Sequence, residues 1–345
     1  MKSLENALLG LKRSLDISDE FAQYTLRSLF FYRKMRELRS YFVLHEVEKL
    51  VKSGSSFKWN QRRRIGVSED AWEVISKMRI NPLIAFAHPR VLAEQPRLLY
   101  YYRGVALISQ KGLGSIVGGN ISRIEGGHTE MLERTYSYKL ALTLNSLISS
   151  LIIASPEVNK KYLLMFFCIT TGAQIQGSWV NAVGEYGSQA IKELLFSRLF
   201  ESIVQVVYKN DRSIDVSVKT KDEISDNIIQ VKILRFKNGC HAIFSSEPDI
   251  SFRDPDNVPL ISIEIKAGID PAAALERLGA AMKSLDNEKA LNPKVKTVYV
   301  SNCITPEVRN RIDQTNPFDY TFNLGEVLND DRTRRRFVGL LGKYI

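Results

Sequence analysis

The chain has 345 residues, of which 44% are hydrophobic and 10% aromatic, so it can bury a sizeable core and is long enough for two domains. This composition excludes a disordered chain. The formal net charge of +10 describes a surface that attracts polyanions, which favours a nucleic-acid partner without requiring one.

The cysteines and the apolar segments bear on where the protein works. Cys168, Cys240 and Cys303 are too far apart for a metal-binding pair or a disulfide framework, which predicts a reducing, cytoplasmic location. The N-terminal segment lacks the apolar core of a signal peptide. The most apolar tract, residues 140–154, is interrupted by Thr, Asn and Ser, so we expect a buried helix there and no membrane partner.

The first half of the sequence has helical periodicity through most of its length. Residues 21–51 repeat Phe, Leu and Tyr at three- and four-residue spacing, which is typical of an amphipathic helix. Ser68, followed by two acidic residues, predicts the start of another helix. A Gly-rich break at residues 112–127 precedes the apolar helix. These features predict a largely helical domain over residues 1–155.

The sequence changes character after Ser155-Pro156, since a residue before proline disfavours helix. We expect a helix at residues 160–171, a Gly-rich loop at 172–187 and a helix at 188–208. Another helix begins at Asp270, with Pro271 in its first turn. The predicted strands are residues 214–218, 228–236, 241–252, 260–266 and 295–301. This order predicts an α/β domain over residues 156–345, with a mixed β-sheet flanked by helices.

Residues 247–266 have the pattern of a β-hairpin, because a turn-rich centre separates two tracts that alternate apolar and polar residues. If the turn is centred between Asp256 and Asn257, Asp249 lies opposite Glu264. Lys266 shares a strand face with Glu264, because side chains alternate along a strand. Two carboxylates and an ammonium are therefore expected on one side of the hairpin.

Such a cluster suits phosphodiester hydrolysis. We expect Asp249, Glu264 and the backbone carbonyl of Ile265 to bind Mg²⁺, whose oxygen ligands and bound waters fit this set. Lys266 then orients the attacking water or neutralises charge on the phosphate. The alternative is that Glu264 and Lys266 lie on a solvated sheet face. Asp256 is expected to form the turn and is the second choice as metal ligand.

Two segments carry a resemblance to a known family. The tract EIKAGIDPAAALERL from Glu264, and the upstream GAQIQGSWVNAVG, resemble type II restriction endonucleases of the AvaI/BsoBI group. Residues 83–119, with PRLLYYYRGVALISQKG, are similar to the XcyI type. The resemblance implies a restriction-endonuclease-like PD-(D/E)XK fold and a homodimer that cuts double-stranded DNA at a short palindrome, leaving 5′-phosphate ends. It gives the catalytic roles to Asp249, Glu264 and Lys266, and recognition and dimer contacts to the helical domain.

The sequence departs from the AvaI/BsoBI pattern at several positions. Arg277 follows Glu276 where the group has a histidine, so we expect no catalytic histidine and treat Arg277 as a phosphate contact. Ala173 and Val180 replace an aspartate and an arginine of the Gly-rich segment, which puts the recognition sequence in doubt. The remaining DNA contacts expected in that segment are Gln176, Ser178 and Asn181.

Other charged residues have two interpretations each. Glu193, on the helix ahead of the strands, is either a supporting acid or a solvent-facing residue. Arg62, Arg63 and Arg64 form either a phosphate clamp or a solvated loop. Lys111 lacks the spacing of a Walker motif, so we expect no nucleotide cofactor. Two rival functions stay open: a structure-specific or repair deoxyribonuclease of the same fold, and a non-catalytic DNA-binding protein.

Overall fold

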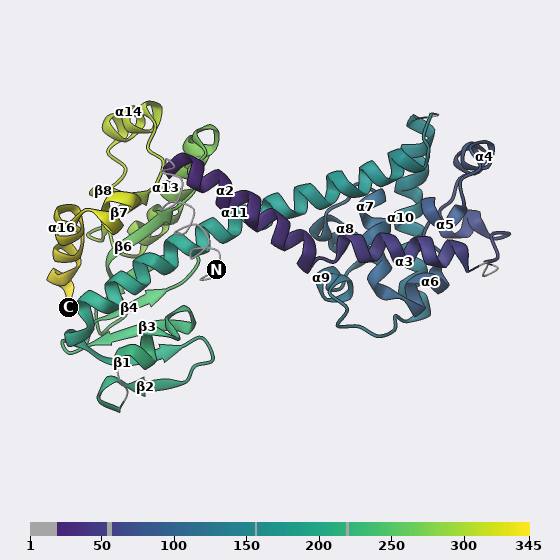
Figure 1. The fold of residues 1–345 in the computed structure, drawn as a ribbon. Coiled ribbons are helices and arrows are strands. Elements are labelled where there is room, and N and C mark those ends of the chain that lie inside the picture. The colour runs from purple at the N-terminus through teal and green to yellow at the C-terminus, as the bar shows by residue number, and fades with distance from the viewer. Residues whose placement is uncertain (1–18, 54–56, 156, 219–220) are drawn as a thin grey trace. The chain divides into compact units, whose positions relative to one another are not determined.

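The computed structural model describes residues 19–53, 57–155, 157–218 and 221–345, and the chain divides into two compact units (Figure 1). Unit 1 is Met1–Trp179 and unit 2 is Val180–Ile345. The division falls inside one long helix, so this helix contributes to both units. The boundary predicted at Ser155-Pro156 coincides with the break between two helices of unit 1.

The regular secondary structure in the described residues of unit 1 is helical, as the periodicity predicts. Ser68 caps α4 by accepting a hydrogen bond from the amide of Ala71, at 3.2 Å. The helices are α2 (Asp19–Glu37), α3 (Ser40–Lys52), η1 (Arg62–Ile65), α4 (Glu69–Lys77), α5 (Pro82–Ala85), α6 (Pro89–Glu94), η2 (Pro96–Leu98), α7 (Leu99–Val105), α8 (Gln110–Val117), α9 (Ile121–Glu125), α10 (Arg134–Ala154) and α11 (Lys160–Leu199).

Two local expectations for unit 1 are wrong. The single helix expected at residues 21–51 is divided into α2 and α3 at Arg39, which has a φ of +52°. The Gly-rich break expected at residues 112–127 contains most of α8 and all of α9. Asn120 starts α9 by accepting from the amide of Arg123, which offsets the weak helix propensity of the neighbouring glycines.

The core of unit 1 is built on α10. Leu140, Leu144 and Ile148 are fully buried and repeat at four-residue spacing. The buried amide of Asn145 donates to the carbonyls of Ile65 and Ala87, so its polar group is satisfied inside the core. By length and composition alone, α10 and the helical stretch Lys160–Ser202 could each cross a membrane, although core helices also meet this criterion.

The loop predicted at residues 172–187 is wrong, because α11 runs unbroken through it. No proline interrupts residues 157–199, and a Cβ added at Gly172, Gly177 or Gly184 would meet nothing within 4 Å. These glycines therefore lie on open faces of a helix and do not form turns. The helix predicted at residues 188–208 ends early at Leu199, because the β-branched run that follows alternates in burial and forms a strand.

Unit 2 contains an eight-stranded sheet within its described residues, in the order β2-β1-β3-β4-β5-β6-β7-β8. The strands are β1 (Ile203–Tyr208), β2 (Ser213–Asp215), β3 (Val231–Phe236), β4 (His241–Phe244), β5 (Ile250–Arg253), β6 (Pro259–Lys266), β7 (Lys296–Ser301) and β8 (Tyr320–Asn323). The helices are η3 (Phe200–Ser202), η4 (Val216–Val218), α12 (Lys221–Ser225), η5 (Ile228–Gln230), η6 (Pro271–Ala273), α13 (Ala274–Leu291), α14 (Pro306–Thr315), α15 (Leu324–Asn329), α16 (Asp331–Leu341) and η7 (Gly342–Tyr344).

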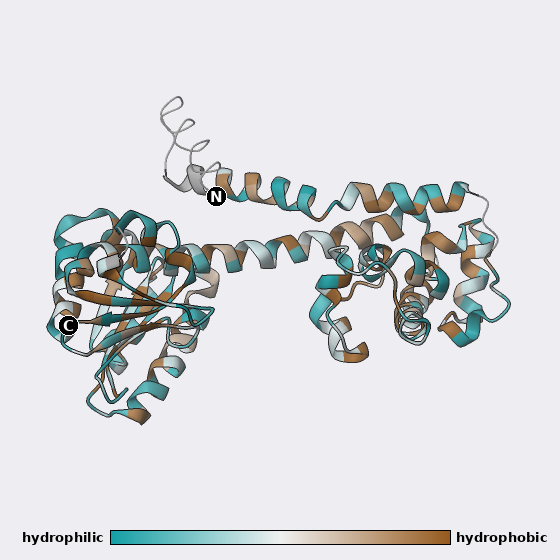
Figure 2. Ribbon diagram, turned by 90° about the horizontal axis from the view of Figure 1, so that it is seen from below, coloured by the Kyte–Doolittle hydropathy of each residue, from teal (hydrophilic) through white to brown (hydrophobic). Residues whose placement is uncertain are grey.

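The sheet is mixed, which confirms the predicted α/β class. Strands β1 to β6 pair antiparallel, whereas β6, β7 and β8 are parallel and are connected through α13 and α14. The second half of α11, together with α16, packs on one face of the sheet in a shared apolar cluster. On the other face α13 and α14 pack against Tyr299. Figure 2 shows the hydrophobic strands enclosed between these layers.

Strands β5 and β6 form the predicted hairpin with the predicted register. Ile250 pairs with Ile263 and Ser251 with Ser262, so the position of Asp249 continues this register opposite Glu264. The turn is longer than two residues, because Asp254 accepts from the amide of Val258 at 2.8 Å. The carboxyl end of β6 lies at the opposite end of the hairpin from this turn.

Candidate active site

The structure brings Asp249, Glu264 and Lys266 together at the carboxyl end of β6. Asp249 immediately precedes β5, and its Oδ2 accepts a hydrogen bond of 2.7 Å from the amide of Ile265. This bond holds the carboxylate of Asp249 beside the end of β6, at Ile265, the residue between Glu264 and Lys266. The convergence expected from strand alternation is therefore present.

A second contact positions Asp249 from α11. The hydroxyl of Ser188 donates to Oδ1 of Asp249 at 3.1 Å. The helix comes this close because residue 187 is glycine: a Cβ there would lie 2.3 Å from the Cβ of Ala267. Gly187 thus lets α11 approach the residue after β6 and places Ser188 beside the aspartate.

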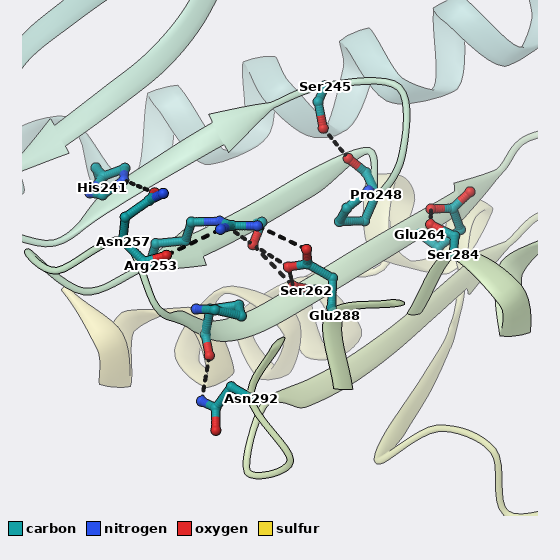
Figure 3. Close-up of polar contacts among 12 residues, drawn as sticks. His241, Ser245, Pro248, Arg253, Asn257, Ser262, Glu264, Ser284, Glu288 and Asn292 are labelled. Carbon is teal, nitrogen blue, oxygen red and sulfur yellow. Dashed lines mark hydrogen bonds and ion pairs between the residues drawn. The ribbon is translucent and has the colours of Figure 1, made fainter. Parts of the chain in front are cut away.

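Glu264 is buried between β6 and α13, with 1% of its surface exposed. Its Oε2 accepts from the hydroxyl of Ser284 at 2.7 Å, a contact visible in Figure 3. Its Oε1 accepts from the ammonium of Lys266, whose side chain is 22% exposed. Both carboxylate oxygens therefore have a donor, and the lysine still reaches the surface.

The two acids interact unfavourably. Burial raises the pKa of Asp249 to about 6, and the negative charge of Glu264 adds to the effect, against the hydrogen bonds and the cation that lower it. An additional positive charge between the carboxylates would relieve this repulsion. The atoms available as metal ligands here are all oxygens, which hard divalent cations such as Mg²⁺ prefer. The residues therefore fit a divalent cation held by Asp249, Glu264 and the carbonyl of Ile265.

Among the described residues, no group of three or more His, Cys, Asp or Glu side chains gathers at metal-binding spacing. The predicted site has only two acidic side chains and completes its ligands with a backbone carbonyl. A cation held by such a set would keep positions for water and phosphate, unlike a cation in a closed structural metal centre.

A second buried acid lies farther along the same layer. Glu288 of α13 is 4% exposed, and its Oε1 accepts from Arg253 at 2.8 Å. Its Oε2 accepts from the hydroxyls of Ser251 and Ser262, at 2.8 and 2.7 Å. Figure 3 shows this group, the Glu288 network, in the same view as Glu264 and Ser284. Sequence reasoning missed it, although Ser284 and Glu288 lie one helical turn apart on the buried face of α13.

Asp256 and Glu193 do not join the cluster. Asp256 is exposed in the hairpin turn, at the opposite end of β6 from Lys266. Glu193 is exposed on α11 and accepts from Gln189, one turn earlier, at 2.8 Å. Lys192 beside it is buried and donates to the carbonyl of Val231. The side-chain contact from α11 to the cluster comes from Ser188, which no pattern in the sequence singles out.

The arginines proposed as a phosphate clamp lie in η1 of unit 1. Arg62 and Arg63 both bind Glu69, at 2.6 and 2.7 Å, and Arg62 also stacks over Trp72. Their charge is thus partly neutralised within the fold. Arg64 is exposed, and its carbonyl accepts from Tyr138.

The DNA contacts expected in the Gly-rich segment lie on α11. Gln176 is exposed and accepts from Arg27 at 2.9 Å. Ser178 donates to the carbonyl of Gln174 one turn earlier, and Asn181 is exposed. On this helix Ser178 and Asn181 are three residues apart and share a face, whereas Gln176 lies on another face, so the segment is not the Gly-rich loop that the sequence analysis predicts.

Arg277 lies in the first turn of α13, close to the cluster. Its Nη2 donates to the carbonyl of Asp270 at 2.5 Å, and the guanidinium lies over Gly268, where a Cβ would come within 3.0 Å of Nη1. Asp270 caps the start of the helical segment by accepting from the amide of Ala272, as predicted.

The mixed sheet with helices on both faces, preceded by a helical region, is a restriction-endonuclease-like fold. The chain belongs to the XcyI restriction endonuclease family, whose model matches residues 32–330. The resemblance to the XcyI type is confirmed, and the protein is a nuclease whose substrate is DNA. No curated protein matches the chain.

Proposed function

We propose that the protein is a type II restriction endonuclease that hydrolyses double-stranded DNA at a specific site in the presence of Mg²⁺, giving 5′-phosphate ends, and that it works in the cytoplasm. The observation that carries this proposal is the convergence of Asp249, Glu264 and Lys266 at the end of β6 in a chain of this family.

Each residue has a role that follows from its contacts. Asp249, Glu264 and the Ile265 carbonyl would hold the divalent cation, which when bound polarises the scissile phosphate and lowers the pKa of a water molecule. Ser188 and Ser284 orient the two carboxylates by donating to them. The exposed end of Lys266 neutralises negative charge that develops on the phosphate, or holds the attacking water.

The proposal includes a homodimer, because a palindromic site presents the same sequence to two identical subunits. Exposed apolar residues on the unit 1 part of α11 support an interface: Tyr162, Met165 and Ile169 are 41, 54 and 59% exposed and recur at helical spacing. Sedimentation of the Ile169→Glu variant should show a monomer if this surface forms the dimer.

The proposed function is tested by incubating the purified protein with a sequenced plasmid and Mg²⁺ and then mapping the ends. The Lys266→Ala variant should lose cleavage but keep DNA binding, because the carboxylates and the other DNA contacts remain. Lys294→Ala is a matched control, since Lys294 is exposed just before β7, at the opposite end of the parallel pair β6–β7.

The same experiment separates the rival functions. Full cleavage by Lys266→Ala overturns the assignment of the site. Cutting of branched or damaged DNA without discrete fragments from an intact plasmid supports a repair nuclease, and salt-sensitive binding without any metal-dependent cleavage supports a DNA-binding protein.

A further inference from the structure

The Gly-rich part of unit 1 forms two short helices, α8 and α9, joined by a turn at residues 118–120 (Figure 1). We call residues 110–125 the α8–α9 segment. Its buried side chains recur every three or four residues through both helices: Leu113, Val117, Ile121 and Ile124. This stripe packs into the core of unit 1, so the opposite side of the segment faces solvent along its whole length.

The exposed side of the segment is cationic. From residue 104 to residue 129 the sequence has one acidic residue, Glu125, and it is not available at the surface. Its two carboxylate oxygens accept from the buried guanidinium of Arg103, at 2.5 and 3.2 Å. Lys111 and Arg123 are exposed, and neither has an ion pair among the described residues. The segment therefore presents positive charge without a compensating acid of its own.

A buried polar network holds the two helices from beneath. Arg103 of α7 and Gln110, the first residue of α8, both donate to Glu125, the last residue of α9. Arg103 also donates to Gln174 of α11, at 2.6 Å. A buried ion pair adds little net stability compared with apolar residues of the same volume. We interpret this network as a device that fixes one arrangement of α8 and α9.

The turn between the helices is clamped from α10. The hydroxyl of Tyr136 donates to the carbonyl of Gly118 at 2.7 Å, and the ammonium of Lys139 donates to the carbonyl of Val117 at 2.9 Å. Gly118 and Gly119 have φ values of +78° and +81°, and a Cβ at Gly118 would meet nothing within 4 Å. The turn thus presents bare backbone to solvent in a fixed conformation, which lets another molecule approach closely.

We propose that the α8–α9 segment reads the DNA sequence in the major groove, with Arg123 as the specificity-determining residue and Lys111 on a backbone phosphate. The inference rests on the proposed function and deepens it, because it names the element that recognises DNA. The major groove admits a helix, and an exposed arginine donates two hydrogen bonds to O6 and N7 of guanine. Ile116, which is 54% exposed on the same segment, offers an apolar contact to a thymine methyl group.

The first experiment selects duplexes from a random pool by binding to the wild-type protein, with Ca²⁺ in place of Mg²⁺. Ca²⁺ neutralises oxygen ligands without the strict octahedral geometry of Mg²⁺. The Arg123→Gln variant should lose about ten- to hundredfold of the preference for the selected duplex over duplexes changed at one guanine. Its melting temperature should not change, because Arg123 is exposed. Arg79→Gln, which changes an exposed arginine of unit 1 outside the segment, should keep the whole preference.

The second experiment measures the same binding at several salt concentrations. Lys111→Gln should weaken binding to all duplexes about equally and reduce the slope of log Kd against log salt by about 0.9, the value for one lost phosphate contact. Lys49→Gln, which changes an exposed lysine on α3, should leave both the affinity and the slope unchanged.

The outcomes distinguish this inference from the proposed function. If Arg123→Gln keeps the full preference, or if the wild-type protein prefers no sequence, the segment does not read DNA, whether or not the protein cuts a plasmid. If Arg123→Gln changes the sedimentation of the free protein and not its DNA preference, the segment contacts a second copy of the chain instead. If Arg123→Gln loses the preference while the wild-type protein never cleaves a plasmid with Mg²⁺, the reading element stands and the nuclease assignment is wrong.

Discussion

Two groups of acids beside the β5–β6 hairpin differ in how their charge is balanced. In the Glu288 network, one carboxylate receives two hydroxyls and the guanidinium of Arg253. In the cluster of Asp249, Glu264 and Lys266, the two carboxylates share the single ammonium of Lys266. The carboxylate of the Glu288 network has a counter-charge and hydrogen-bond donors for both oxygens, whereas the cluster of Asp249 and Glu264 retains excess negative charge.

The balance of charge in the two groups offers a way to distinguish polar groups that stabilise the fold from polar groups that act in function. A carboxylate with a full set of donors and one cation costs little once folded, but removing a partner exposes the cost of burial. Two carboxylates that share one cation repel each other in the free protein, and the binding of a further cation removes this repulsion. Variants in the two groups should therefore have opposite consequences.

The largest expected effect is on cleavage. Glu264→Gln removes a proposed metal ligand, so the rate of plasmid cleavage should fall about a thousandfold or more. Its melting temperature should stay the same or rise, because the repulsion with Asp249 is removed.

Glu288→Gln is the matched control, another buried Glu in the same layer. It leaves Arg253, whose side chain is 15% exposed, without its counter-charge, so the free energy of unfolding should fall by about 3 kcal/mol. Cleavage per folded molecule should be unchanged below the melting transition. If Glu288→Gln lost cleavage and kept stability, the distinction between the two groups would be wrong.

The second prediction concerns pH. The pKa of Asp249 is raised to about 6 by burial and by Glu264, so this group favours the folded state at acidic pH. The metal-free protein should therefore lose stability as the pH rises from about 4 to above 6, by up to about 3 kcal/mol.

Chemical denaturation of the wild-type protein and of Asp249→Asn, in EDTA at several pH values, measures this effect. The wild-type stability should decline across that range relative to the variant, whose side chain does not titrate. Parallel curves for the two proteins would show that Asp249 has an ordinary pKa and would remove the argument for excess negative charge.

The sequence predicts those parts of the fold and the candidate site that depend on contacts between residues close together in the chain. The register of Asp249 and Glu264 follows from alternation within twenty residues, and it could be predicted because a hairpin is a local structure. The partners from other elements could not: Ser188 and Ser284 are among many serines, and only the packed fold selects them. The loop predicted before Ser188 was wrong because glycine was taken as a turn signal, whereas Gly172, Gly177 and Gly184 lie on open faces of α11 and Gly187 serves a close helix–sheet contact.

The third prediction compares two serines at equal distance from the two acids. Ser284 donates to Glu264 and Ser262 donates to Glu288, each at 2.7 Å and each buried. Both changes to alanine should lower the free energy of unfolding by about 1 kcal/mol. Only Ser284→Ala should also slow cleavage, by about three- to tenfold, because it frees a proposed metal ligand to rotate. Equal cleavage rates for Ser284→Ala and Ser262→Ala would show that Ser284 does not orient Glu264 for catalysis.

The smallest expected effects come from the two acids that the fold leaves outside the cluster. Asp256 is at the far end of the hairpin and Glu193 is on the exposed face of α11, so neither can reach a cation held between Asp249 and Glu264 without moving a secondary-structure element. Cleavage by Asp256→Asn and by Glu193→Gln should therefore stay within about twofold of the wild-type rate, since exposed residues without buried partners tolerate substitution. A loss of cleavage in either variant, with its melting temperature unchanged, would show that a third carboxylate completes the site and that two acids and a carbonyl are not sufficient to hold the cation.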